Sequence, residues 1–273
     1  MTTEGSSGAP FRELRNPSGE RLDFAFHEAS AGDAGSGGTA ARRSVVILAH
    51  GVTSNKDRPW LVALSEALAA AGIASLRFSF AGNGASEGRF EDATLTKEVT
   101  DLGSVLDALA AASVERVAYV GHSMGAAIGV MHAASRARRA SDARDGRDDR
   151  IRALVSLAGM VHVASFFTRH FGDLAFGAPM LGKPASPWNR ALADDAARIG
   201  SLAPPAARIE IPWLLVHGAA DELVPLQDSH DARAAAANRP DLVTLPGVDH
   251  RFTGAIPSMV AAVVQWLQRR LAG

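Results

Sequence analysis

Short apolar runs alternate with helical segments along most of this chain, and this alternation limits the possible folds more than any other feature. Ser44–Ala49 has the sequence SVVILA, a run typical of a strand that is buried on both faces of a parallel sheet. Similar runs follow at Ala74–Phe80, Val117–Val120, Ala153–Ala158, Trp213–His217 and Leu242–Leu245. The pattern predicts an α/β protein with a mainly parallel sheet covered by helices on both faces.

Helical periodicity fills the intervals between these runs. The predicted helices are at about Trp60–Ala71, Leu95–Ala112, Met124–Ser135, Leu226–Ala237 and Pro257–Leu271. With 273 residues, one large domain with a small insertion is expected rather than two equal domains.

The predicted organisation has four parts. Residues 1–43 form an N-terminal tail, a β-hairpin that joins Phe11–Leu14 to Leu22–His27, and a flexible Gly-rich loop. Residues 44–158 and 210–273 form the two halves of the α/β core. Residues 159–209 form an inserted cap, because this segment lacks strand periodicity, is rich in Phe, Met, Pro and Gly, and is too long for an ordinary connection.

Composition excludes several classes of function. The chain has 28 Lys and Arg against 29 Asp and Glu, so a basic nucleic-acid-binding surface is not expected. The chain has no Cys, so its nucleophile must be an oxygen or a nitrogen, and Cys-ligated zinc is excluded. Neither a signal peptide nor a membrane span is predicted, and the expected location is the cytoplasm.

Candidate catalytic residues are expected where parallel strands end, because ligands of such sheets bind at the carboxyl ends of the strands. The pattern G-x-S-x-G occurs twice, around Ser86 and around Ser123. A nucleophilic serine in this pattern needs a strand directly before it and a helix directly after it. Only Ser123 has both, so Ser123 is the predicted nucleophile and Ser86 a structural loop hydroxyl.

A serine hydroxyl needs a base to activate it and an acid to orient that base. Of nine histidines, His250 is the one that follows a late strand and a Gly-containing turn. Asp221 comes directly after the strand Trp213–His217 and is the predicted acid. Glu222 and Asp249 remain rival acids.

Attack on a carbonyl also requires two N–H donors for the oxyanion. One is the amide of Met124, the residue after the nucleophile, at the start of a helix. The other is expected from the loop after Ser44–Ala49, where the amide of Val52 follows His50 and Gly51.

These motifs resemble those of α/β-hydrolases over about Ser44–Leu271, and within that superfamily the chain is similar to cap-bearing esterases related to feruloyl and cinnamoyl esterases and to serine-aminopeptidase-like hydrolases. The chain order Ser, Asp, His is that of α/β-hydrolases. The segments that carry the resemblance are His50–Val52, Ser54–Asp57, Phe78–Gly84, Gly121–Gly125, Asp221–Pro225 and Gly247–His250.

The resemblance implies an α/β-hydrolase fold with a small cap, a Ser123–His250–Asp221 triad, an oxyanion hole formed by the amides of Val52 and Met124, and neither a cofactor nor a metal. The preferred interpretation is a serine hydrolase that cleaves a small-molecule carboxylic ester through an acyl-enzyme intermediate. Ser79 stands where these relatives often have Asp, and Val52 where many have an aromatic residue. These two departures keep the substrate class open.

Several alternatives share the scaffold, because a fold does not decide its substrate. They are a thioesterase, a small-peptide hydrolase, a C–C hydrolase, a perhydrolase and a non-catalytic ligand-binding protein. Phe166 and Phe167 of the predicted cap are candidate walls of the substrate pocket, because such apolar side chains either form a small core of their own or face the site below them.

Overall fold

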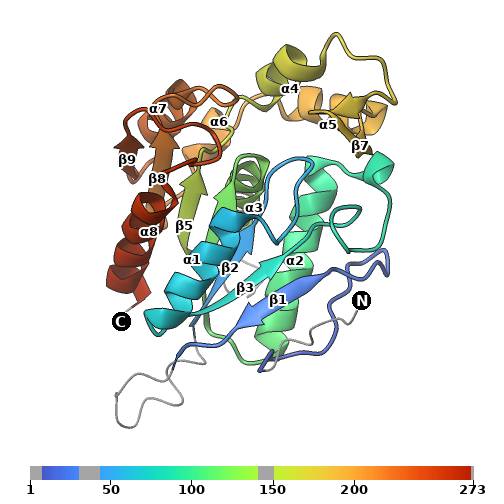
Figure 1. The fold of residues 1–273 in the computed structure, drawn as a ribbon. Helices are drawn as coiled ribbons and strands as arrows, with labels where there is room; N and C mark the ends of the chain where they lie inside the picture. Colours follow the sequence, from blue (N-terminus) through green and yellow to red (C-terminus); the bar gives the residue numbers. More distant parts are fainter. Residues whose placement is uncertain (1–7, 31–43, 141–150, 272–273) are drawn as a thin grey trace.

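The computed structural model describes residues 8–30, 44–140 and 151–271, and a seven-stranded sheet lies at its centre (Figure 1). The strand order is β1-β3-β2-β4-β5-β8-β9, and only β1 runs antiparallel to its neighbour within this described sheet. The strands of the sheet are β1 (Phe24–His27), β2 (Ser44–Ala49), β3 (Ala74–Phe78), β4 (Arg116–His122), β5 (Ile151–Leu157), β8 (Trp213–Gly218) and β9 (Asp241–Leu245). The predicted mainly parallel α/β sheet is therefore confirmed.

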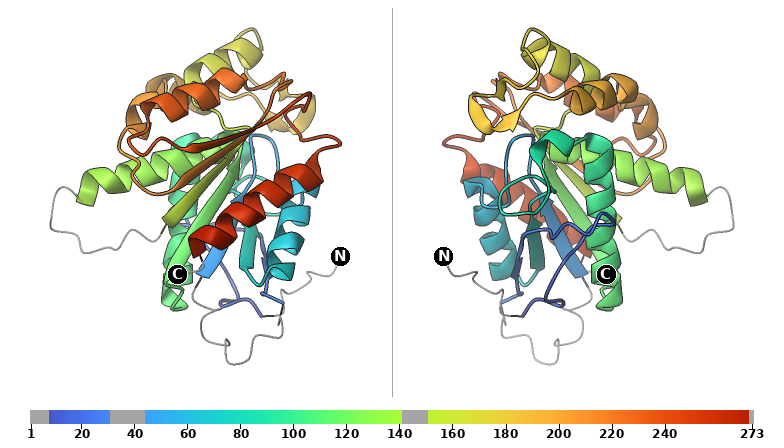
Figure 2. Two further views of the ribbon diagram at one scale, coloured as in Figure 1. Left: turned by 90° about the vertical axis from the view of Figure 1, so that its left-hand side faces the viewer. Right: turned by 90° about the vertical axis from the view of Figure 1, so that its right-hand side faces the viewer.

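Helices cover both faces of the sheet (Figure 2). On one face α1 packs beside α8, and on the other face lie α2 and α3. The core helices are α1 (Pro59–Ala70), α2 (Leu95–Ala111), α3 (Met124–Ala140), α7 (Leu226–Ala235) and α8 (Ile256–Leu271), with the short 3-10 helix η2 at Phe90–Asp92. Local signals fix their starts, since Pro59 occupies the first turn of α1 and the Thr94 hydroxyl accepts a hydrogen bond from the Lys97 amide at the start of α2.

Strand β2 shows why the apolar runs are continuous. Val45 and Ile47 belong to the cluster under α2 and α3, whereas Val46 and Leu48 belong to the cluster under α1 and α8. Successive side chains of a strand point to opposite faces, so a strand covered on both sides favours apolar residues at nearly every position.

The predicted N-terminal hairpin is wrong. Phe11–Leu14 is not a strand, and β1 pairs with β3 instead. The turn itself is present: the Asn16 carboxamide accepts hydrogen bonds from the amides of Ser18 and Glu20, but only an isolated bridge joins Arg15 to Arg21. The turn at Asn16 depends only on neighbouring residues, so the sequence predicts it correctly. The pairing of β1 depends on β3, which is distant in the chain. The expected flexible loop falls largely on residues 31–43, outside the described part.

The segment predicted to form a cap, residues 159–209, lies above the end of the sheet at which the parallel strands finish (Figures 1 and 2). It contains α4 (Val163–Phe171), the strands β6 (Pro179–Met180) and β7 (Lys183–Pro187), α5 (Arg190–Ile199) and α6 (Ala203–Ala206). The expectation of no strands was wrong, because β6 and β7 form a small antiparallel pair. The two ends of the cap meet where the Leu202 amide donates to the Val161 carbonyl at 2.8 Å.

Within the three described stretches, no helix is both long enough and apolar enough to cross a bilayer.

Candidate active site

Ser123 lies in the turn between β4 and α3, with a backbone φ of 54°. A non-glycine residue rarely adopts this left-handed conformation, which costs about 1–3 kcal/mol unless the surroundings enforce it. The Ser123 amide donates to the Leu157 carbonyl at 2.9 Å, which fixes the turn on the neighbouring strand.

The two glycines of the motif are required by close packing. A Cβ on Gly121 would lie 2.3 Å from the Gly125 carbonyl oxygen, and a Cβ on Gly125 would lie 2.4 Å from the His50 carbonyl oxygen. Both contacts are with backbone that cannot move aside. The motif therefore presents Ser123 in a turn too tight for side chains on either side.

Asp221 and His250 come together at the ends of β8 and β9. The His250 Nδ1 lies 2.8 Å from the Asp221 Oδ2, and both side chains are almost fully buried. The other oxygen, Oδ1, accepts hydrogen bonds from the amides of Leu223 and Val224 at 2.9 and 2.8 Å. An ionised carboxylate only accepts hydrogen bonds, so Nδ1 of His250 carries the hydrogen and donates it to Asp221. The unprotonated nitrogen of a neutral His250 is therefore Nε2.

Burial opposes the charge of Asp221, but hydrogen bonds from His217, His250 and the Val224 amide outweigh it and hold the pKa of Asp221 well below its ordinary value. Sequence analysis assigned no catalytic role to His217, and its contact with Asp221 was not predicted. The His217 Nε2 lies 3.2 Å from the Asp221 Oδ2 and 2.9 Å from the Val224 carbonyl oxygen. Both are acceptors, so Nε2 carries the hydrogen.

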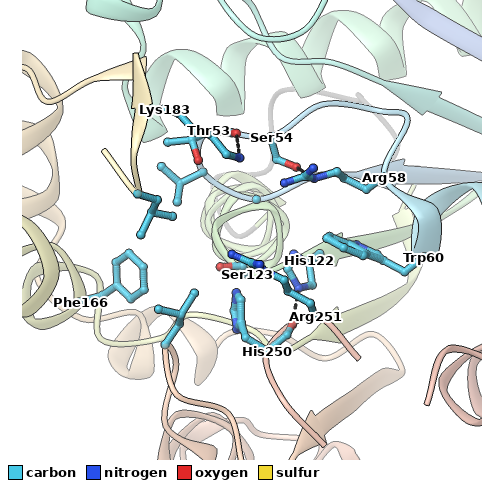
Figure 3. A pocket seen from close by; sticks show the side chains of 14 residues that line it. Thr53, Ser54, Arg58, Trp60, His122, Ser123, Phe166, Lys183, His250 and Arg251 are labelled. Atoms are coloured by element: carbon cyan, nitrogen blue, oxygen red, sulfur yellow. Dashed lines mark hydrogen bonds between the residues drawn. The ribbon is translucent and has the colours of Figure 1, made fainter. Parts of the chain in front are cut away.

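The Ser123 hydroxyl is buried and has no hydrogen-bond partner among the described residues. Ser123 and His250 line the same pocket (Figure 3). Hydrogen bonds between a nucleophile and its base are often long in a ligand-free enzyme and shorten when substrate binds.

The amides of Val52 and Met124 are available as donors, since neither donates to another residue in the described part of the chain. Val52 lines the pocket, and Met124 is the first residue of α3. His50 holds the Val52 loop, because its Nδ1 lies 2.8 Å from the Gly51 carbonyl oxygen and its Nε2 accepts from the Phe80 amide at 3.1 Å. Burial lowers the pKa of His50 to about 4.

His122 contacts His250 through a hydrogen bond and through its ring. Its Nε2 donates to the His250 carbonyl at 2.9 Å, and the two rings are 4.8 Å apart. Burial, followed by the proximity of His250, lowers the pKa of His122 to about 3, so this imidazole is neutral.

The rival residues have other contacts. The Ser86 hydroxyl donates to the Ser79 carbonyl at 2.7 Å and accepts from the Asp23 amide at 2.8 Å. The Glu222 carboxylate accepts from the His250 amide at 3.3 Å and does not contact the imidazole, whereas the Asp249 carboxylate accepts from the amides of Arg251 and Thr253. Neither acid competes with Asp221 for the ring.

The two candidate pocket residues differ in position. Phe166 lines the pocket that also contains Ser123 (Figure 3). Leu181 and Leu223 line the same pocket. Phe167 is not one of the lining residues, and its ring stacks on Trp188 at an interplanar angle of 8°. Sequence analysis also missed three cationic residues of the pocket: Arg58, Lys183 and Arg251. They are distant from one another in the chain, and no motif marks them.

No cluster of three or more His, Asp or Glu side chains suited to a metal ion occurs among residues 8–30, 44–140 and 151–271.

The sequence model described as the alpha/beta hydrolase family matches residues 46–266. Two uncharacterised proteins of Mycobacterium tuberculosis are each 27% identical to this chain over 194 residues, covering 71% of this chain and 59% of theirs. The chain thus spans less than two thirds of the length of these curated relatives.

Solved structures share the whole fold. Est1E from Butyrivibrio proteoclasticus with ferulic acid bound superposes with a TM-score of 0.79 at 23% identity, covering 96% of this chain and 99% of Est1E. The monoacylglycerol lipase of Paleococcus ferrophilus gives a TM-score of 0.66 at 20% identity, covering 91% and 99%. The predicted resemblance is confirmed for the α/β-hydrolase fold.

Proposed function

The chain belongs to the alpha/beta hydrolase family, and on this basis we propose that it is a serine hydrolase that cleaves carboxylic esters through an acyl-enzyme on Ser123. The observation that carries the proposal is the strained Ser123 turn in the same pocket as a buried His250–Asp221 pair. Strain of this kind persists where the surrounding structure enforces it, and it concentrates at functional sites.

In the first half of the reaction, the Ser123 Oγ attacks the ester carbonyl and its proton passes to Nε2 of His250. Asp221 stabilises the imidazolium through the hydrogen bond at Nδ1. The amides of Val52 and Met124 donate to the oxyanion. When the tetrahedral intermediate collapses, the bond to the alcohol breaks, His250 gives its proton to the departing oxygen, and the acyl group remains on Ser123.

In the second half, His250 takes a proton from a water molecule, which attacks the acyl carbonyl. The bond to the Ser123 Oγ breaks, and the proton returns from His250 to Oγ. The net result is hydrolysis of one ester bond to an acid and an alcohol. The apolar side of the pocket, with Phe166, Leu181 and Leu223, provides a surface for the uncharged part of the substrate.

A fluorophosphonate probe and a 4-nitrophenyl acetate assay test the proposal. We expect the probe to label Ser123, located by mass spectrometry of the digested protein, and the ester to release 4-nitrophenolate in a burst of about one equivalent when deacylation is slower. Ser123→Ala should abolish labelling and lower kcat by about 10⁴-fold or more.

Ser86→Ala is the matched control, because it is the same substitution in the second G-x-S-x-G pattern. Its hydroxyl bridges two loops, so we expect unchanged labelling and at most about a tenfold loss of kcat. Labelling that survives in folded Ser123→Ala protein would overturn the assignment of the nucleophile.

A further inference from the structure

The pocket around Ser123 contains three positively charged side chains and no carboxylate among its described lining residues. Arg58 directly precedes α1, Lys183 lies on β7 of the cap, and Arg251 follows His250. Figure 3 shows the three side chains spread around Ser123 rather than gathered on one wall. Three separate segments thus bring positive charge to one small site.

None of the three cations is neutralised within the described part of the chain, since no carboxylate oxygen lies within 4.0 Å of their nitrogens. The contacts of Arg58 are neutral: its Nε donates to the Ser54 hydroxyl at 2.9 Å, and its guanidinium lies 5.5 Å from the Trp60 ring centroid. Lys183 donates to the Thr53 carbonyl at 2.6 Å.

The nearby acids are occupied elsewhere. The Asp57 carboxylate pairs with Lys56 and with Arg77. Glu222 accepts from the His250 amide, and Asp249 accepts from the amides that follow it. Asp221 is engaged by His250 and His217.

The cations act on one another through the pocket. Burial, and after it the positive charges of Arg58 and Arg251, lower the pKa of Lys183. Burial and the charge of Arg251 also lower the pKa of Arg58. Burial opposes the charge of Asp249, but hydrogen bonds from Thr253 and from the Arg251 amide, together with the charge of Arg251, lower the pKa of Asp249. This carboxylate lies more than 4.0 Å from the guanidinium nitrogens of Arg251. Like charges held together without a close counter-ion repel one another, and a bound anion relieves this repulsion.

Two further polar groups in the same walls lack partners. The Trp60 indole N–H and the Thr53 hydroxyl are buried and make no hydrogen bond among the described residues. Both residues line the pocket. An N–H group can only donate, so the acceptor that it lacks must be an electron-rich atom.

We propose that the preferred substrate is an ester that also carries an anionic group of the carboxylate class, held by Arg58, Arg251 and Lys183 while Ser123 attacks the ester carbonyl. This inference rests on the proposed hydrolase function and adds the charge of the substrate to it. The anionic group can belong to the acyl part or to the alcohol part, and the experiment separates these two cases.

The test uses two pairs of esters, and the members of each pair share the same carbon skeleton. Mono-4-nitrophenyl adipate against 4-nitrophenyl hexanoate places the charge on the acyl part, and 4-acetoxybenzoate against 4-acetoxybenzamide places it on the alcohol part. We expect kcat/KM to favour the anionic member of at least one pair by about 10- to 100-fold, the scale of a hydrogen bond to a charged group. Equal rates within both pairs would overturn the proposal.

Charge-removing variants locate the effect. In Arg58→Gln and in Arg251→Gln, the ratio of kcat/KM for the anionic ester to that for its neutral partner should fall about tenfold. Arg190→Gln, the same change at an exposed cap residue stacked on Phe176, should leave the ratio as in the wild type. A ratio that is equally high in all four proteins would refute the roles of Arg58 and Arg251.

The dependence of kcat/KM on ionic strength separates an electrostatic effect from a change in packing, because salt screens charges and leaves packing unchanged. Raising the ionic strength from about 0.01 M to about 0.15 M shortens the Debye length from about 30 Å to about 8 Å. We expect kcat/KM to fall for the anionic ester and to stay level for its neutral partner. Equal salt dependence of the two esters would contradict electrostatic selection.

Binding to Ser123→Ala protein separates this inference from the hydrolase proposal. Calorimetric titration with each ester pair reports affinity without turnover. Tighter binding of the anionic ester supports the cationic pocket even if the wild type hydrolyses nothing, in which case the hydrolase proposal alone fails. Hydrolysis without any preference in binding or in rate would leave the hydrolase proposal standing and overturn the anionic substrate.

Discussion

At the scale of single residues, the Asp221 carboxylate is the most constrained group in the site. Its two oxygens accept hydrogen bonds from His250, from His217 and from two backbone amides. Each of these donors stabilises the ionised form, so the acid remains charged in spite of its burial. A fixed negative charge at this position favours the tautomer of His250 that carries its hydrogen on Nδ1 and leaves Nε2 unprotonated, as the proposed mechanism requires.

Asp221→Asn should therefore lower kcat by about 10³- to 10⁴-fold, because an amide in this position favours the wrong tautomer of His250. Glu222→Gln is the matched control at the adjacent residue. It touches only the His250 amide at 3.3 Å, so a loss of about threefold at most is expected. Steady-state kinetics with 4-nitrophenyl acetate measures both variants, and near-normal kcat in Asp221→Asn would move the role to another acid.

Sequence reasoning could propose Ser123, Asp221 and His250 because each follows a predicted strand and the three occur in a known chain order. It could not separate Asp221 from Glu222 by contact, since adjacent residues share the same sequence context and only the backbone of the turn decides which carboxylate reaches the ring. It also missed His217, whose partner Asp221 lies four residues further on, beyond the end of β8. Arg58, Lys183 and Arg251 were not predicted as pocket residues, because Arg and Lys are common on protein surfaces and no motif marks these three.

At the scale of secondary structure elements, the aromatic side chains of α4 lie in two different environments. Phe166 and Phe167 are both 2% exposed, yet only Phe166 lines the pocket. Phe167 packs against Phe171 and Trp188 within the cap. One helix thereby joins the wall of the pocket to the core of the cap.

Phe166→Ala should shift the preferred acyl length and change the kcat/KM of one ester relative to another by about 10- to 200-fold, because it alters an apolar wall of the pocket. Phe167→Ala should lower the free energy of unfolding by about 3–5 kcal/mol and keep the order of ester preference. A series of 4-nitrophenyl esters from acetate to octanoate, together with urea unfolding, measures both effects. An unchanged preference in folded Phe166→Ala protein would contradict the assignment.

The elements themselves were predictable where burial dictates the sequence. The apolar run and the Gly-bracketed turn predicted β4 and the first residue of α3, because a strand covered on both faces is mostly apolar. The observed β4 is longer than predicted, and α3 continues to Ala140 rather than ending at Ser135. The hairpin prediction was wrong because the pairing of β1 depends on β3, about fifty residues away along the chain. The strands β6 and β7 were missed because they are short and rich in proline, with only two pairs in register.

At the scale of the whole molecule, the core holds an acid that no motif predicted. Glu98 of α2 is 2% exposed, and its Oε2 has no hydrogen-bond partner among the described residues. Burial and the nearby charge of Asp101 raise the pKa of Glu98 well above its usual value. The native state therefore keeps this carboxyl protonated over a range of pH in which the unfolded chain releases the proton.

This difference gives stability a dependence on pH. A group whose pKa is raised by folding loses its stabilising effect as the pH rises above the unfolded pKa, here about 4.5, toward the native pKa. Glu98→Gln cannot ionise. The unfolding free energy of the variant minus that of the wild type should therefore be constant below about pH 4.5 and grow above it, by up to about 1.4 kcal/mol per pH unit.

Urea unfolding at intervals from pH 4 to pH 8 measures this difference, and Glu66→Gln on the exposed side of α1 serves as the control for the chemical change. Any fixed cost of placing an amide in the core shifts the Glu98→Gln curve without changing its slope. Parallel curves for Glu98→Gln and the wild type across this range would contradict a protonated Glu98.

The hydrogen bond between the Leu202 amide and the Val161 carbonyl holds the two ends of the cap next to each other. The cap connects β5 to β8, and these two strands are neighbours in the sheet. A segment with adjoining ends can be lengthened, shortened or exchanged by recombination while the sheet that carries Ser123, Asp221 and His250 keeps its shape. We expect related proteins to differ in substrate mainly because the segment that corresponds to residues 159–209 differs, while the residues on the sheet and the reaction that they perform stay the same.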